Sequence, residues 1–435
     1  MQVKYPTKPF ECWQKAKEMR LQNYKDIINA KADGKLLFAG QRGAPTEVMA
    51  GFGDIEFLGM NDYAASVAHD PPMALEAFER WEAKGYARDL CAYWRCFMGS
   101  VLTDHFYFGG QFPKIDFVFT QNACDTNGKC QLLMAETLGA HYVMVDIPVV
   151  GDYKQSNKPY YVDYVAAQFN EAIEKVSRIS GRKYDDEKLI EAVYNRCSAE
   201  VLWSEIMMMN QVTPCPMDMK AQYTFLVPLL VAKYKPETIT YYQGLKQEME
   251  ARVKEGISAV PTERFRLLHH GAPPWHSLRF FRVPQAYGAV FIGSDFSIIQ
   301  FAAFEEKPNG TFGPREDPRK IGVKLRNREE ALRYFAEWYI QRGASTWCGA
   351  RTRIDHQLHL VKEWHVDGVV YHVDRGCENN TSGVLESKIG VSSALNVPTM
   401  VYEGNRGDTR DWSEVESIDR LESFLESRGL RKIEE

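Results

Sequence analysis

The sequence predicts an α/β protein with two flavodoxin-like parallel-sheet domains that face a cleft, together with a helical middle and N-terminal region. Two observations support this fold class. Short apolar runs alternate with helical stretches in the first 152 residues and again after residue 261, as β-α-β units of a parallel sheet do. Both stretches also contain the same series: an aspartate (Asp116 or Asp367), an apolar strand, a cysteine, a helix and a short strand.

The first α/β domain is expected over residues 1–152, and it begins with a helix over residues 10–33. Its apolar runs are short and are bounded by glycine or turn residues, which is typical of buried strands. These runs are Leu36–Gly40, Ile55–Gly59, the strand from Phe117 to Cys124, and His141–Val149. The helices between them are expected around Glu47–Gly51, Ala74–Lys84 and Gly128–Leu138.

Residues 153–260 are expected to form a mainly helical middle region, with long helices over Val162–Ser180 and Asp186–Met209. The second α/β domain is expected over residues 261–435. Its predicted elements are strands over Gly288–Gly293, Val369–Cys377 and Pro398–Glu403, and helices around Arg328–Arg342 and from Ser382. A capping-box pattern at Ser413–Glu416 predicts a last helix whose apolar face carries Val415, Ile418, Leu421, Phe424 and Leu425.

Composition excludes several classes of function. A chain of 435 residues is too long for one ordinary core, and its net charge of -5 provides no basic field for nucleic acid or an anionic membrane. Met1–Phe10 has no apolar signal segment, and the longest apolar stretch, Phe225–Ala232, is too short to span a bilayer. Nine cysteines without an export signal are expected to be reduced thiols, so we expect a cytoplasmic protein.

Cysteines at strand ends carry the strongest chemical signal. Cys124 and Cys377 each close an apolar strand, and ligands gather at the carboxyl ends of parallel strands. Soft thiolates in one site favour an iron–sulfur cluster or zinc, and a Cys3His zinc site completed by His372 or another histidine is the competing hypothesis. Cys91 and Cys96 lie five residues apart on a predicted helix, so only one of them can readily face the site.

Other polar residues give weaker signals. Glu47 follows the first strand and would lie near its carboxyl end, or would simply stabilise a helix N-terminus. His269, His270 and His276 flank the loop Gly271–Pro274, which would either cover an active site or form a surface turn. The chain has neither G-x-x-x-x-G-K-[ST] nor G-x-G-x-x-G between a strand and a helix, so any nucleotide hydrolysis is expected on another chain.

Taken together, these residues resemble the 2-hydroxyacyl-CoA dehydratase and benzoyl-CoA reductase superfamily. The resemblance rests on Pro45–Glu47, the Leu90-Cys91 pair, Cys124 thirty-three residues later, the helical middle region and the late strand ending in Cys377. It implies one [4Fe-4S] cluster whose ligands are Cys91, Cys124 and Cys377. Three thiolates would leave one iron of a cubane free for water or substrate, and burial and hydrogen bonds would tune its potential.

Within that superfamily the chain most resembles the B-type chains of ATP-dependent benzoyl-CoA reductases. The implied reaction is dearomatisation of benzoyl-CoA to cyclohexa-1,5-diene-1-carbonyl-CoA by low-potential single-electron transfer. The implied partners are a homologous second catalytic subunit, an ATP-hydrolysing iron–sulfur activator and ferredoxin. Glu47, His269, His270 and His276 are candidates for the proton donor. The segment Glu378–Gly383 departs from many relatives, and the resemblance assigns no role to Cys96, Cys130 or Cys348.

Two other functions stay open at this stage. A 2-hydroxyacyl-CoA dehydratase subunit would recycle its catalytic electron and release water. A non-catalytic subunit would position CoA and carry an electron-transfer cluster, while its partner performs the chemistry.

Overall fold

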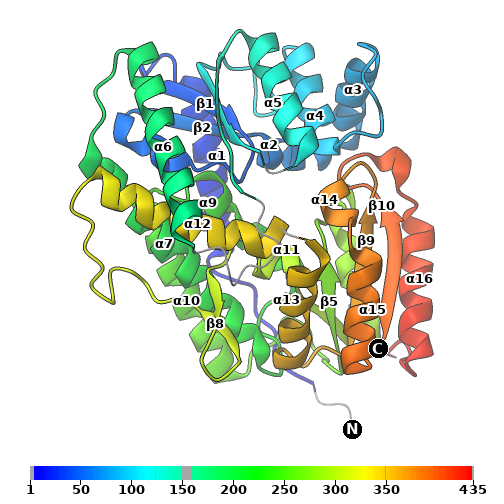
Figure 1. Ribbon diagram of the computed structural model, residues 1–435. Helices are drawn as coiled ribbons and strands as arrows, with labels where there is room; N and C mark the ends of the chain where they lie inside the picture. The colour runs from blue at the N-terminus through cyan, green and yellow to red at the C-terminus, as the bar shows by residue number, and fades with distance from the viewer. Residues whose placement is uncertain (1–3, 123, 149–157, 348, 434–435) are drawn as a thin grey trace.

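Two four-stranded parallel sheets form the centre of the protein (Figure 1). The computed structural model describes residues 4–122, 124–148, 158–347 and 349–433. The first sheet has the order β2-β1-β3-β4 and consists of β1 (Leu36–Gly40), β2 (Ile55–Gly59), β3 (Phe117–Gln121) and β4 (His141–Val145). The second has the order β10-β9-β5-β6 and consists of β5 (Phe265–His270), β6 (Ala289–Ser294), β9 (Gly368–Asp374) and β10 (Thr399–Gly404).

The two sheets have the same topology. In each, the third strand along the chain lies on the opposite side of the first strand from the second, which is the arrangement of the first four strands in flavodoxin-like folds. The repeat extends to hydrogen bonds. Asp116 accepts the backbone N–H of Leu37 and Asp367 accepts that of Arg266, each at 2.8 Å and each at the second residue of a first strand. The predicted α/β class with parallel sheets is confirmed.

Helices cover both sheets. Around the first sheet lie α1 (Trp13–Asn29), η1 (Thr46–Phe52), α2 (Met60–Ala68), α3 (Pro71–Glu82), α4 (Ala92–Leu102) and α5 (Asp125–Leu138). Around the second lie η4 (Trp275–Tyr287), α11 (Asp295–Ile298), α13 (Gly349–Glu363), α14 (Glu378–Thr381), α15 (Val384–Leu395), η5 (Thr409–Asp411) and α16 (Glu414–Ser427). A small antiparallel hairpin, β7 (Phe304–Glu306) and β8 (Phe312–Pro314), precedes α12 (Arg328–Trp347).

The middle of the chain is helical, as the sequence indicates. Its elements are α6 (Pro159–Ser180), α7 (Asp186–Met208), η3 (Met209–Gln211), α8 (Met219–Phe225), α9 (Val227–Val231) and α10 (Pro236–Glu255). Together with α12, helices α6 and α7 bury one face of the first sheet, where Phe38 and Phe119 point, while Leu37 and Ala39 belong to the core on the other face. The domain limits at residues 152 and 260 stay a prediction.

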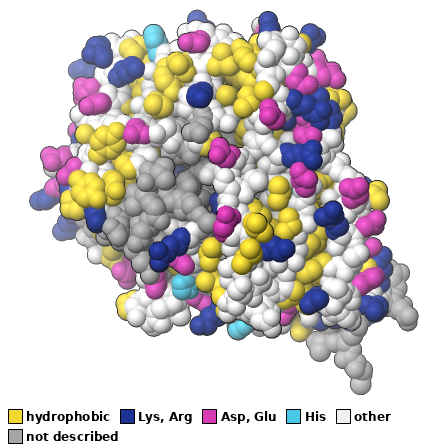
Figure 2. Space-filling view, turned by 45° about the vertical axis from the view of Figure 1, so that its right-hand side comes forward, with side chains coloured by type: hydrophobic (Ala, Val, Ile, Leu, Met, Phe, Trp, Pro, Cys, Tyr) yellow, Lys and Arg dark blue, Asp and Glu magenta, His cyan; other side chains and the backbone are white. Residues whose placement is uncertain are grey.

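The surface carries no large field of one sign on the face shown in Figure 2, where lysine and arginine side chains are interspersed with aspartate and glutamate. Among the helices of the described ranges, none is both long and apolar enough to cross a membrane.

One strand of the two large sheets is missing from the sequence-based prediction, as are both strands of the β7–β8 hairpin. The sequence places the start of the second sheet at Gly288, yet β5 lies between β9 and β6 as a central strand. Its sequence includes Arg266 and ends in two histidines, so it lacks an apolar run. The Arg266 side chain is buried because its guanidinium donates to the carbonyl oxygen of Trp364 at 2.9 Å and pairs with Glu263 at 2.5 Å. Tertiary hydrogen bonds therefore stabilise a charge that local patterns predict to be exposed.

Smaller differences concern the ends of elements. The strands that precede Cys124 and Cys377 end at Gln121 and Asp374, so both cysteines lie in the following loops.

Two differences concern helices. Helix α2 is missing from the prediction. On α16, Leu421 and Leu425 are buried as expected, but Val415 is 72% exposed because it lies in the first turn, outside the packed face.

A buried ion pair connects the two sheet systems. Arg95 of α4 is fully buried and donates from Nη1 to Oδ2 of Asp408, in the loop after β10, at 2.8 Å. Its Nε donates to the carbonyl oxygen of Leu90 at 2.9 Å. Arg410 also pairs with Asp408. Although burial raises the pKa of the Asp408 carboxyl, the Arg410 and Arg95 guanidinium groups hold it at about 2.

Replacing Asp408 tests this connection. Asp408→Asn removes the nearer charge partner of the buried Arg95 and leaves it only Glu82, at 3.5 Å, so the free energy of unfolding at pH 7 should fall by about 2 to 3 kcal/mol in urea titrations. The folded pKa of Asp408 lies below its ordinary value, so its contribution is present above about pH 4 and is lost as the pH falls toward 2. The difference in free energy of unfolding between wild type and variant should therefore become smaller as the pH falls from 4 to 2.

The matched control is Glu330→Gln, which removes the exposed Arg326–Glu330 pair and should change stability by less than about 0.5 kcal/mol. An equal effect of the two substitutions would contradict the importance of the buried pair.

Candidate functional site

Each of the three predicted cysteine ligands is the N-cap residue of a helix. Cys91 precedes α4, Cys124 precedes α5, and Cys377 precedes α14. A helix N-terminus carries partial positive charge and presents backbone N–H groups, both of which stabilise an adjacent thiolate or an anionic group bound to it. Cys124 is exposed, while Cys91 and Cys377 are half-buried.

The loops that hold Cys91 and Cys377 touch. Gly376 has φ +75°, and a Cβ placed on it would lie 2.7 Å from the carbonyl oxygen of Leu90. The two thiols are close enough to interact electrostatically. Burial raises the pKa of the Cys377 thiol to about 12; Arg406 opposes this shift, while Asp374 and the Cys91 thiol add to it.

A fourth thiol lies in the same neighbourhood. Burial raises the pKa of Cys130, on α5, to about 12, and the thiols of Cys91 and Cys124 contribute to that increase. Sequence reasoning gave Cys130 no role. Cys96 instead lies in the core, with its sulfur 3.9 Å from the carbonyl oxygen of Ala64, so only Cys91 of this pair faces the site. Cys348 lies outside the described residues.

The described residues contain no group of three or more His, Cys, Asp or Glu side chains arranged to hold one metal ion. The zinc hypothesis therefore gains no support from them. His372 stacks on Tyr402 at 4.6 Å, and its Nδ1 donates to the carbonyl oxygen of Ala272 at 2.8 Å. A cubane differs from a single ion because each thiolate binds a different iron, so its ligand sulfurs need not converge on one point. The thiol donors present fit a cluster in their chemistry.

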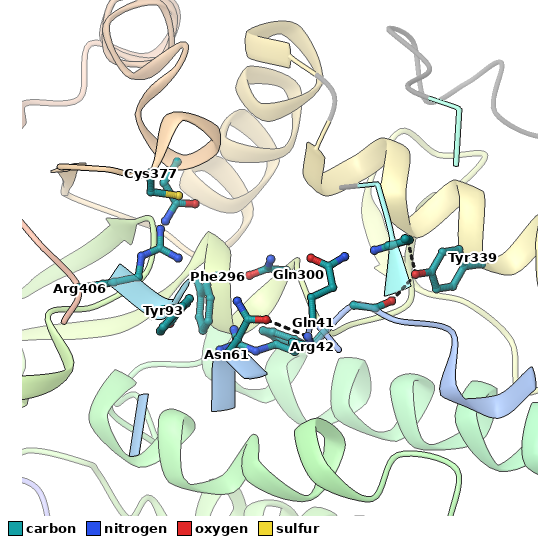
Figure 3. Close-up of a pocket in the computed structure, with 13 residues that line it drawn as sticks. Gln41, Arg42, Asn61, Tyr93, Phe296, Gln300, Tyr339, Cys377 and Arg406 are labelled. Atoms are coloured by element: carbon teal, nitrogen blue, oxygen red, sulfur yellow. Dashed lines mark hydrogen bonds between the residues drawn. The ribbon is translucent and has the colours of Figure 1, made fainter. Parts of the chain in front are cut away.

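A pocket lies where the strands of both sheets end (Figure 3). The first sheet system contributes the loop after β1, the start of α2, the end of β3 and α4, and α12 contributes Tyr339. The second contributes α11 and the loop after it, the β9–α14 segment and the loop after β10. The lining residues are Gln41, Arg42, Gly43, Asn61, Tyr93, Gln121, Phe296, Gln300, Phe301, Tyr339, Cys377, Asn380 and Arg406. The pocket thus contains one predicted cysteine ligand, Cys377, beside aromatic and amide side chains.

Two guanidinium groups flank the ring of Tyr93. Arg406 lies 4.7 Å from its centroid and Arg42 lies 5.6 Å from it, within reach of cation–π attraction. Both arginines are also buried ion-pair members, Arg42 with Asp62 at 2.7 Å and Arg406 with Asp374. Among the described residues that line the pocket none is acidic. The pocket therefore favours an electron-rich or anionic group.

The hydroxyl group of Tyr93 forms a hydrogen bond with Trp275. Its hydroxyl oxygen accepts the indole N–H of Trp275 at 2.6 Å, which leaves the phenolic O–H to donate elsewhere. The Tyr93 side chain is buried and lines the pocket. Sequence reasoning missed Tyr93, Arg42 and Arg406, although the two arginines follow predicted strands at the carboxyl ends where ligands gather.

The predicted acid–base residues lie elsewhere. Glu47 is fully buried, with its Oε1 2.7 Å from Nη1 of Arg196, and does not line the pocket. His276 donates from Nε2 to the carbonyl oxygen of Asn405 at 3.0 Å, and burial lowers its pKa. His269 is buried against Tyr402, and desolvation lowers its pKa strongly. Glu47, His269 and His276 therefore do not form one cluster at the pocket.

His270 is the exception, because it lines a second, adjoining pocket. Its Nδ1 pairs with Asp295, whose other oxygen accepts the backbone N–H of Gly271 at 2.9 Å. Burial favours the neutral acid, but His270 and this N–H hold the pKa of Asp295 below its ordinary value. The Nε2 of His270 lies 3.1 Å from the carbonyl oxygen of Asn380, a residue that lines both pockets.

Fold and site together define a two-sheet α/β protein with a thiol-bearing pocket at the facing carboxyl ends. The chain belongs to the family of the 2-hydroxyglutaryl-CoA dehydratase D-component, whose model matches residues 41–427. This result confirms the superfamily that the sequence resembled.

Individual relatives fall in two branches. The chain is 24% identical over 422 residues to the (R)-2-hydroxyisocaproyl-CoA dehydratase alpha subunit of Clostridioides difficile, covering 95% of each chain. It is 22% identical over 417 residues to the lactoyl-CoA dehydratase alpha subunit of Anaerotignum propionicum, covering 92% of each. It is also 24% identical over 360 residues to the B-type chain of benzoyl-CoA reductase from Thauera aromatica, covering 79% of this chain and 78% of that one. Identity alone does not separate the branches.

The contact between the two cysteine loops can be tested at Gly376. Gly376→Ala should lower the free energy of unfolding by about 1 kcal/mol for the positive φ and by at least about 1 kcal/mol more for the clash with Leu90. The matched control is Gly310→Ala, where φ is +78° and nothing lies within 4 Å of the added Cβ. Cys377 should also react faster with a thiol reagent in the Gly376 variant alone. An equal loss of free energy of unfolding in the two variants would show that the loops do not depend on this contact.

Proposed function

We propose that this chain is the iron–sulfur subunit of an enzyme that transfers single electrons to a CoA thioester. The observation that carries the proposal is the pocket, which joins the Cys377 thiol, two arginines and Tyr93 at the facing ends of two sheets. Cys91, Cys124 and Cys377 would hold a [4Fe-4S] cluster, which when bound supplies low-potential single electrons. A homologous second subunit, an ATP-hydrolysing activator and ferredoxin are the proposed partners.

The chain's own residues suit an anionic, electron-rich substrate state. Arg42 and Arg406 would stabilise negative charge on a reduced acyl group, because their cost of burial is already offset by Asp62 and Asp374. Tyr93 would supply a proton through its O–H, and the Trp275 N–H would stabilise the phenolate left behind. Gln41 and Asn61 add amides near these arginines, and Asn61 fixes the loop by accepting the N–H of Arg42 at 2.8 Å.

The substrate that the pocket favours is an aromatic acyl group, as in benzoyl-CoA. Phe296 and Phe301 lie beside Arg42, at 5.0 and 5.4 Å from its guanidinium, and an aryl ring could stack among these side chains. We therefore propose ATP-dependent reduction of benzoyl-CoA to the cyclohexadiene thioester as the reaction. A dehydratase subunit is the second candidate, because the dehydratase alpha subunit from Clostridioides difficile aligns over 95% of both chains.

The ligand set is tested by iron and acid-labile sulfide per chain after anaerobic co-expression with the partner subunit. Cys91→Ser, Cys124→Ser and Cys377→Ser should each lose about one cubane, that is about four irons per chain. Cys96→Ser controls for a buried cysteine outside the site. Cys130→Ser should also keep its iron. If Cys130→Ser lost the cluster, the hypothesis of three thiolate ligands would have to be replaced by one of four. Stoichiometric zinc in the wild type would contradict the redox proposal.

Electron accounting separates the two reactions. With activator, ATP and a low-potential donor, a reductase consumes an electron pair and two protons for every benzoyl-CoA converted. A dehydratase converts a 2-hydroxyacyl-CoA to the enoyl-CoA with no net consumption of electrons. We expect stoichiometric donor oxidation with benzoyl-CoA. Turnover of a 2-hydroxyacyl-CoA after a single priming reduction would instead establish the dehydratase.

A further inference from the structure

The turn that carries Cys377 lies between the two pockets. It covers Cys377–Ser382 and includes α14, and we call it the Cys377 turn. Cys377 lines the pocket (Figure 3), Asn379 lines the adjoining pocket, and Asn380 lines both. The backbone N–H of Thr381 donates to the carbonyl oxygen of Cys377 at 3.1 Å, which closes the turn. The position of Cys377 therefore depends on what holds this turn.

Arg353 of α13 holds two carbonyl groups of the Cys377 turn. Its Nη2 donates to the carbonyl oxygen of Asn379 at 2.9 Å, and its Nη1 donates to that of Ser382. Burial lowers the pKa of Arg353, while Asp295 and the Cys377 thiol oppose this shift, so the guanidinium lies within electrostatic reach of Cys377. A planar guanidinium can bridge two carbonyl oxygens in a fixed geometry, which the single ammonium of a lysine does less well.

Asn380 connects the Cys377 turn to both pockets. Its carbonyl oxygen accepts from Nε2 of His270 at 3.1 Å. Its side-chain oxygen, when it faces Arg406, accepts from Nη2 of that residue at 2.7 Å. Its backbone N–H lies near the Cys377 sulfur. Burial raises the pKa of this thiol to about 12, and the N–H opposes that rise, although the neutral thiol makes no capping hydrogen bond. The turn is therefore anchored on the side of each pocket.

The carbonyl group that Arg353 holds and the N–H that faces Cys377 belong to one peptide unit, Asn379–Asn380. A hydrogen bond from a cation to the carbonyl oxygen polarises the amide and makes its N–H a stronger donor. A neutral thiol is a weak acceptor, whereas a thiolate bound to a cluster is anionic and accepts more strongly. Hydrogen bonds to cluster sulfurs and nearby positive charge stabilise the more reduced form of a cluster, so they raise its reduction potential.

We propose that Arg353 and His270 are positioning residues that hold the Cys377 turn and raise the reduction potential of a cluster bound there. The inference rests on the proposed function, because it assumes that Cys377 is a cluster ligand. Neither residue lines the pocket in which the acyl group is proposed to bind, so both would act on the cluster and not on the substrate. A structural role alone would change stability and leave the potential unaltered.

The first test measures the potential of this chain's cluster in the complex with the partner subunit, by an EPR-monitored redox titration after anaerobic co-expression. Arg353→Gln removes the charge and the bridge between the two carbonyl groups. At a fixed potential its ratio of oxidised to reduced cluster should rise about tenfold, which corresponds to about 59 mV for a one-electron couple. Arg353→Lys keeps the charge and should change the ratio less than about threefold. Arg351→Gln, which replaces an exposed arginine of the same helix, should change it less than about twofold.

The second test measures how firmly the Cys377 turn is held, by hydrogen–deuterium exchange in the same complex. The reporters are the backbone N–H groups of residues 381–382, which donate within the turn. His270→Asn keeps a polar group toward Asp295 but is too short to reach the Asn380 carbonyl, so exchange should become about tenfold faster. His270→Gln places an amide N–H near the position of Nε2 and should keep exchange within about threefold of wild type. This pair stays informative if Arg353→Gln does not fold.

The outcomes separate the inference from the proposed function. A lower potential in Arg353→Gln with normal iron content, together with faster exchange in His270→Asn than in His270→Gln, would support the inference. An unchanged potential in Arg353→Gln, an equal change in Arg351→Gln, or equal exchange rates in the two His270 variants would overturn it and leave the proposed function standing. A wild-type complex without a [4Fe-4S] cluster would contradict the proposed function itself, and the inference with it.

Discussion

The site depends on the contact that holds the carboxyl ends of two parallel sheets against each other. Two of the interactions in this contact are the buried Arg95–Asp408 pair and the close approach of Gly376 to the carbonyl of Leu90. Both involve the segment around Cys91 on one side and loops of the second sheet on the other. The pocket residues come from both sheet systems, so the pocket depends on how the two systems pack together.

The internal repeat explains how one chain builds such a site. Asn61 accepts the N–H of Arg42 after β2, and Asp295 accepts the N–H of Gly271 after β6, so the same hydrogen bond closes the first crossover loop of each sheet. The two copies have different chemistry at this point. The first presents neutral amides beside Arg42, whereas the second pairs Asp295 with His270. The same loop-closing hydrogen bond thus occurs twice, with neutral groups in the first sheet and an ion pair in the second.

Burial of charge is the main cost of this arrangement. Arg42, Arg95 and Arg406 are each paired with an aspartate, and removing one member of such a pair costs more than the pair contributes. The pairs keep cationic groups at fixed positions in a region from which water is largely excluded. A preorganised positive environment of this kind stabilises negative charge that develops on a bound group, with little rearrangement at the moment of reaction.

Local patterns in the sequence were sufficient for seven of the eight strands of the two large sheets, for the parallel α/β class and for the family resemblance, because apolar runs, turn residues and cysteine positions are properties of short segments. Strand β5 was not predicted, because the partners that bury Arg266, His269 and His270 are distant in sequence. Long-range partners also decide which polar residues reach the pocket. Glu47 and His276 were candidates for the proton donor from their positions in the sequence. In the tertiary structure Glu47 pairs with Arg196, and Tyr93 lines the pocket. Which residues meet across the two sheets is decided by long-range packing, and a linear pattern contains no record of it.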